Sequence, residues 1–154
     1  MDNALLPATL DNRYRGHVLG LWLFGLVLFV RTGIAAGSVF NGRTAAGTAD
    51  GLPLDVYGPA GAQAVIAMFA AWGVAHLFLN ALGVLVLVRY RALVPLFFTL
   101  LLAEHLARRV VFTLIPVASS EGFSLIGPLL LGATILGVVL SFVPRSRRTV
   151  LSQA

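Results

Sequence analysis

The sequence contains no cysteine and no lysine, and it has few charged residues of either sign. The absence of cysteine excludes disulfides, thiolate metal sites, iron–sulfur clusters and cysteine nucleophiles. The absence of lysine excludes a Schiff base to retinal or to a similar chromophore. All 11 basic residues are arginine, which is typical of a GC-rich bacterial gene.

The low content of charged residues predicts a membrane protein. Only 11% of the 154 residues are charged, whereas about a quarter are charged in a soluble domain. Hydrophobic residues make up 58% of the chain, and the mean hydropathy is +0.92. A single core of this size cannot hide so much apolar surface from water. The net charge of +5 comes from dispersed arginines, so we expect the lipid bilayer and not a nucleic acid as the partner.

Four apolar segments are long enough to cross the hydrocarbon core, which takes about 20 helical residues. They are residues 17–40, 60–88, 92–118 and 122–143, and a loop over residues 38–59 joins the first two. The segments predict one domain over residues 1–154, an all-α bundle of four transmembrane helices. We expect the first segment to stay in the mature protein as a helix and not to be removed as a signal peptide, because no convincing small-residue cleavage site follows it.

The arginines also predict the orientation of these segments. Seven of them lie at segment ends on one side of the predicted bundle, whereas the other side has only Arg43; the seven are Arg13, Arg15, Arg89, Arg91, Arg145, Arg147 and Arg148. By the positive-inside rule both termini are then cytoplasmic. This pattern predicts a multi-pass protein of the bacterial inner membrane.

One stretch interrupts the apolar pattern. The run LLAEHLARRVVF places Glu104, His105, Arg108 and Arg109 inside the third segment. Glu104 and Arg108 are four residues apart with the acid first, the favourable order for an ion pair, and His105 and Arg109 form a second such pair. A charge at the centre of a bilayer costs about 2.5–3.5 kcal/mol. We therefore expect these side chains to face the interior of the bundle.

Two other segments supply polar groups at the same depth. At a rise of 1.5 Å per residue, Glu104 lies about 18 Å into its segment. His76 lies at a matching depth on the antiparallel second segment, and Arg31 reaches this layer if the first helix continues through it. On the second segment the 3.6-residue period puts His76 and Asn80 on one stripe with Gly73 and Gly83, which favours a close helix contact.

The candidate site is this layer, which consists of Arg31, His76, Asn80, Glu104, His105, Arg108 and Arg109. The simplest interpretation is a polar clasp that fixes the register of the helices. A second is a binding site for a quinone or an anionic lipid at the arginine-rich layer. A third is haem b with His76 and His105 as axial ligands. A proton relay through Glu104, His105 and His76 in an oligomeric transporter is a fourth.

Two enzyme classes fit poorly. A ferritin-like metal site needs several inward glutamates and Glu-x-x-His motifs, whereas the predicted spans hold one carboxylate. No histidine or nucleophile elbow accompanies Ser119 and Ser120. We therefore favour a non-enzymatic accessory, scaffold or assembly subunit that binds other membrane protein subunits or copies of itself. The run GPLLLGATILGVVLSF and the short loops resemble the four-helix scaffold proteins of the ergosterol pathway in general plan, and we assign the chain to no family on this basis.

Overall fold

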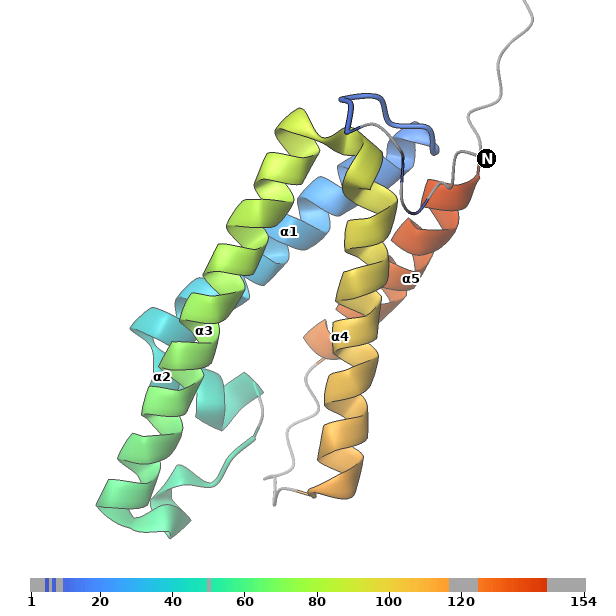
Figure 1. Ribbon diagram of the computed structural model, residues 1–154. Coiled ribbons are helices and arrows are strands. Elements are labelled where there is room, and N and C mark those ends of the chain that lie inside the picture. Colours follow the sequence, from blue (N-terminus) through green and yellow to red (C-terminus); the bar gives the residue numbers. More distant parts are fainter. Residues whose placement is uncertain (1–4, 6, 8–9, 50, 117–124, 144–154) are drawn as a thin grey trace, which may run out of the picture.

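The part of the protein that the structure describes is built from four long helices. The computed structural model describes residues 5, 7, 10–49, 51–116 and 125–143, and all regular structure among these residues is helical. The long helices are α1 (Val18–Phe40), α3 (Gly58–Arg89), α4 (Val94–Leu114) and α5 (Ile126–Phe142) (Figure 1). Short helical turns connect them: α2 (Gly42–Thr44), η1 (Ala45–Ala49), η2 (Leu54–Tyr57) and η3 (Arg91–Leu93). The prediction of an all-helical chain is confirmed for this part of the molecule.

The third helix ends earlier than the sequence predicts. We expected it to run to residue 118, but α4 ends at Leu114, and Ile115 has the non-helical angles φ −124° and ψ 79°. Pro116 explains the end, because a proline ring disfavours the helical conformation of the residue before it. Ser119 and Ser120 lie outside the described residues, as does the start predicted for the fourth segment at residue 122.

The predicted loop over residues 38–59 is partly helical. It contains α2, η1 and η2, and α3 begins at Gly58 within it. The side chains of Ala46, Leu54 and Ala62 are buried together there. The exposed ion pair between Arg43 and Asp55, with an Nη2 to Oδ1 distance of 3.4 Å, joins two of these turns. An exposed pair of this kind contributes about 0–1 kcal/mol, so the small apolar cluster holds this segment together.

Two of the helices could cross a membrane by length and composition. They are α1 and the continuous run Leu54–Arg89, which contains η2 and α3. The other two long helices fall short for different reasons. Three charged residues, Glu104, Arg108 and Arg109, lie within α4, and α5 has only 17 residues, although it is apolar.

The long helices do not all contact one another equally. The α1 helix packs extensively against α3 and also against α5, and α4 packs mainly against α5. The α3 and α4 helices meet at the turn around Tyr90 and diverge from it, so they have few contacts (Figure 1). This divergence leaves the facing sides of α3 and α4 apart at the depth of the polar residues.

The apolar core lies toward the Tyr90 end of the molecule. Phe24 of α1 makes edge-to-face contacts with Phe97 and Phe98 of α4, with ring centroids 6.0 and 5.0 Å away. Such pairs contribute about 0.5–1.5 kcal/mol beyond their buried area. Tyr14, which precedes α1, closes this end by a hydrogen bond of 3.1 Å with Ser141 of α5. Burial raises the pKa of Tyr14 above its usual value, so its hydroxyl stays protonated.

Small residues allow α1 and α3 to approach closely. A Cβ atom added to Gly73 would lie 2.8 Å from the carbonyl oxygen of Ala35, and one added to Gly83 would lie 2.6 Å from Leu28. These glycines belong to the stripe predicted on the second segment, and the stripe does lie in a helix contact. A second pair of small residues, Gly33 and Gly37, has no described atom within 4 Å of an added Cβ. At that pair, therefore, no close approach of another described helix is present.

Candidate functional site

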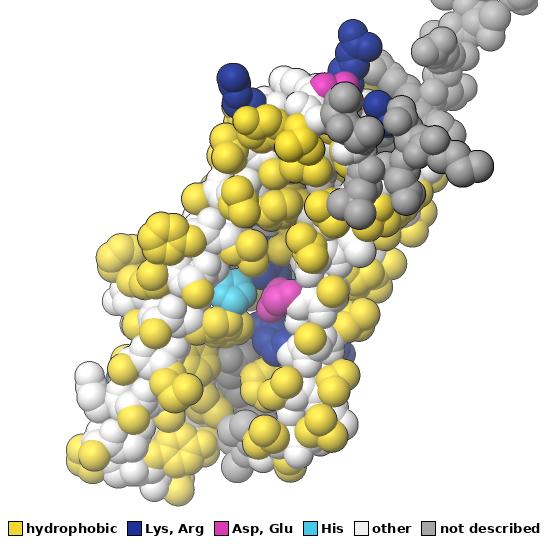
Figure 2. All heavy atoms as spheres, viewed as in Figure 1, with side chains coloured by type: hydrophobic (Ala, Val, Ile, Leu, Met, Phe, Trp, Pro, Cys, Tyr) yellow, Lys and Arg dark blue, Asp and Glu magenta, His cyan; other side chains and the backbone are white. Residues whose placement is uncertain are grey.

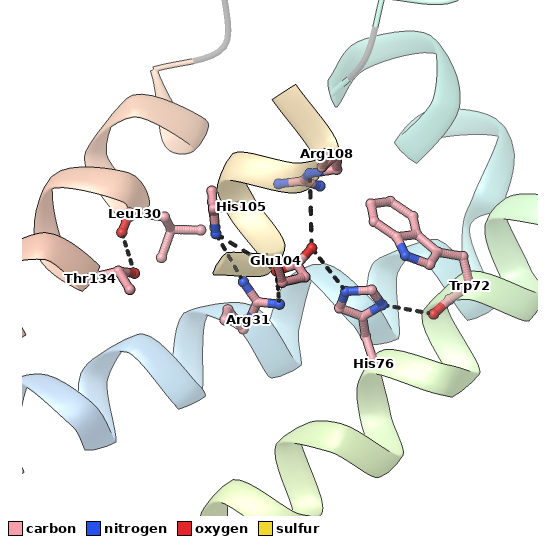
Figure 3. A network of polar contacts seen from close by, with 8 residues as sticks. All are labelled: Arg31, Trp72, His76, Glu104, His105, Arg108, Leu130 and Thr134. Atoms are coloured by element: carbon pink, nitrogen blue, oxygen red, sulfur yellow. Dashed lines mark hydrogen bonds and ion pairs between the residues drawn. The ribbon is translucent and has the colours of Figure 1, made fainter. Parts of the chain in front are cut away.

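A single carboxylate connects three helices. Glu104 of α4 accepts a hydrogen bond of 2.9 Å from Nη2 of Arg31 on α1. Its other oxygen lies 3.7 Å from Nε2 of His76 on α3 and 4.0 Å from Nε of Arg108 on its own helix (Figure 3). The helical pair Glu104–Arg108 predicted from the sequence is present, but the contact with Arg31 is shorter by more than an ångström.

The guanidinium group of Arg31 is the most buried charge in this cluster. The side chain is 6% exposed, and its Nη1 atom lies 3.3 Å from Nδ1 of the buried His105. A guanidinium group can only donate, so Nδ1 of His105 accepts and the proton of a neutral imidazole is on Nε2. Nε of Arg31 and Nε2 of His105 have no hydrogen-bond partner among the described residues. Arg31 depends on Glu104 for compensation of its charge.

Trp72 belongs to the site, although the sequence did not predict it as a site residue. Its carbonyl oxygen accepts a hydrogen bond of 3.0 Å from Nδ1 of His76, which directs Nε2 of that imidazole toward Glu104. The guanidinium carbon of Arg108 lies 5.3 Å from the centroid of the Trp72 ring, within the range of a cation–π contact. Trp72 precedes His76 by one helical turn, and this spacing is the signal that could have revealed it.

The cluster opens to one side of the molecule. Figure 2 shows histidine, glutamate and arginine side chains in a hollow between α3 and α4, surrounded by apolar side chains. Glu104 is 28% exposed and Arg108 is 34% exposed. One carboxylate faces two guanidinium groups here, so the positive charges of the two arginines exceed the negative charge of Glu104 by one. A polar group that enters between these two helices can therefore reach an arginine.

Two predicted site residues lie apart from this network. Asn80 is only 1% exposed, but its amide nitrogen and oxygen have no hydrogen-bond partner among the described residues. Arg109 is exposed, and the predicted pair with His105 is wrong, because the side chain of Arg109 forms no ion pair or hydrogen bond in the described part of the chain. The physical reason is that all residues from 109 to 116 are exposed, so this end of α4 stands away from its neighbours.

The arrangement does not fit haem coordination by His76 and His105. Each of these imidazoles has a nitrogen 3.7 Å from an oxygen of Glu104, so the carboxylate lies between the two rings where the iron would have to bind. No group of three or more potential metal ligands is present within the described ranges. The histidines are instead parts of a network centred on Glu104.

No family model, curated protein or solved structure matches this chain. Its function therefore has to be inferred from the geometry of the helices and of the charged network.

Proposed function

We propose that the protein is a non-enzymatic, four-span protein of the bacterial inner membrane that acts as an accessory or scaffold subunit of a larger membrane complex. In this proposal the charged network is a structural clasp. The observation that carries the proposal is that Glu104 contacts groups from α1, α3 and α4 at once. Ion pairs of this kind replace the hydrophobic attraction that helices lose when they are surrounded by lipid.

The surface of the helices supports the four-span arrangement. Large apolar side chains are exposed on every long helix, among them Trp22, Phe29, Phe78, Val110 and Leu129. The 21 residues of α4 extend about 31 Å, close to the thickness of the hydrocarbon core. Glu104, the acidic residue of α4, contacts Arg31 and His76, and Arg108 of the same helix lies over Trp72. Arg109 is exposed toward the Leu114 end of α4, where its long side chain can extend to the headgroups.

The proposed topology can be tested with single cysteines, because the natural chain has none. Asn12 lies near the Tyr90 end and Asp55 in the segment between α1 and α3, and both are exposed. We expect a membrane-impermeant maleimide to label Asp55→Cys in intact spheroplasts and Asn12→Cys only after permeabilisation. Neither substitution removes an arginine, so the topology signals are unchanged. Equal labelling of both cysteines in intact spheroplasts would contradict the proposal.

The accessory role is tested by purification from native membranes in a mild detergent. We expect a second membrane protein to co-purify in a fixed molar ratio with the natural chain and to be lost from Glu104→Gln, because loosened helices no longer present one binding surface. The matched control is Arg109→Gln, which changes a neighbouring charge outside the network. Loss of the partner from both variants, or from neither, would contradict the role of the clasp.

The opening between α3 and α4 favours a second candidate function. Arg108 is partly exposed there and lies over Trp72, so a quinone or an anionic lipid could bind beside it. The purified samples test this candidate as well, when Arg108→Gln is added to the set. A bound small molecule that is extracted from the natural chain and from Arg109→Gln, but not from Arg108→Gln, would favour ligand binding over the scaffold.

A further inference from the structure

A second surface feature lies outside the charged network. A groove of about 630 Å³ runs along α1 from Val18 to Phe29, beside Leu87 of α3, and Arg91 lies at its end. The remaining lining residues are apolar and include Trp22 and Gly25. The groove does not include Phe24, Val27 or Leu28, which face the apolar core, so it lies on another side of α1.

The length of the groove corresponds to one leaflet of a bilayer. Val18 and Phe29 are 11 residues apart, which is about 16 Å along a helix. Half of a hydrocarbon core of about 30 Å is about 15 Å. The groove starts at the Tyr90 end of the molecule, where Arg13, Arg89 and Arg91 lie. An acyl chain that extends from this end toward the centre of the bilayer would have the length of the groove.

Arg91 is held in a position to bind a headgroup. Its Nε atom donates a hydrogen bond of 2.9 Å to the carbonyl oxygen of Leu87, which orients the guanidinium group at the mouth of the groove. Its two terminal nitrogens have no hydrogen bond to a described residue. A guanidinium group with two adjacent free donors matches the oxygen atoms of a phosphate. Trp22 lines the groove and is exposed, as expected for an aromatic residue near the headgroups.

We propose that this groove binds one acyl chain of an anionic phospholipid, with the phosphate on Arg91. The inference rests on the membrane location in the proposed function, and it is independent of the role of the charged network. Charge selects an anionic lipid over a zwitterionic one, because the described arginines at this end outnumber Asp11, the one nearby carboxylate among the described residues. Gly25 forms part of the groove wall, and its missing side chain leaves room for the acyl chain.

The test uses the fluorescence of Trp22 in vesicles. Trp72→Phe removes the only other tryptophan and keeps an aromatic ring under Arg108. The variant is reconstituted in phosphatidylcholine with equal mole fractions of either brominated phosphatidylglycerol or brominated phosphatidylcholine. We expect brominated phosphatidylglycerol to quench Trp22 with an apparent affinity about fivefold higher, the contribution of one interfacial arginine.

Three variants in this background separate the possible outcomes. Arg91→Gln should abolish the preference, whereas Arg89→Gln, which removes the same charge outside the groove, should retain it. Gly25→Leu should reduce quenching by both lipids, because the new side chain occupies the groove; its Cβ atom would make only an ordinary contact of 3.6 Å with Leu87. The groove proposal would be overturned if Arg89→Gln and Arg91→Gln lost the preference for phosphatidylglycerol equally. It would also be overturned if the parent Trp72→Phe variant showed no such preference. Absence of quenching by either lipid would instead contradict the membrane location.

Discussion

Replacement of Glu104 by glutamine is expected to lower the free energy of unfolding by about 3 kcal/mol. The variant leaves the guanidinium group of Arg31, which is 6% exposed, without its closest compensating charge. Removal of one partner from a buried pair costs about 3–5 kcal/mol. The lower end of this range applies because Glu104 is itself partly exposed. The change can be measured as a shift in the unfolding transition of the protein in detergent.

A double variant shows whether the cost comes from the unpaired arginine. Arg31→Met together with Glu104→Met removes both charges, and replacement of both partners by apolar groups is often neutral or stabilising. We therefore expect the double variant to be more stable than Glu104→Gln. Arg109→Gln is the control for a charge change in the same helix and should have no measurable effect. If Glu104→Gln unfolds no more easily than Arg109→Gln, the network does not act as a clasp.

The substitution Gly137→Ala, which adds a single methyl group, is expected to have the second large effect on the stability of the protein. A Cβ atom at this position would overlap the ring of Phe98, and that ring is fully buried against Phe24. The ring has no exposed side toward which it can move. Overpacking of a core costs about 1–3 kcal/mol, so Gly137→Ala should separate α5 from α4 and lower the unfolding temperature in detergent.

The same helix contains a matched control. Gly132 is also inside α5, but an added Cβ atom would have no described atom within 4 Å. Gly132→Ala should be neutral or stabilise the helix by up to about 1 kcal/mol, because alanine restricts the unfolded chain more than glycine does. Equal destabilisation by both alanines would show that helix α5 is sensitive to any side chain, and the packing at Phe98 would then not explain the effect of Gly137→Ala.

The sequence by itself determined the helical character of the chain and the depth of its polar residues. An apolar run of this length indicates a helix by itself, without information about the segments that pack against it. Counting residues along two antiparallel helices was enough to place His76 level with Glu104, and these side chains are in contact. The 3.6-residue period was enough to place Gly73 and Gly83 on one face of α3. These properties are local, since they depend only on the geometry of one helix.

The tertiary structure alone decided which groups meet. A helical period specifies a face but not the helix that covers it, so the sequence could not show that Arg31 lies closer to Glu104 than Arg108 does. Packing of α1 between α3 and α5 selected Arg31. The outward divergence of α4 left Arg109 exposed and opened the hollow beside Arg108. Contacts between segments far apart in the chain depend on crossing angles and side-chain volumes, and these arise only when all four helices pack together.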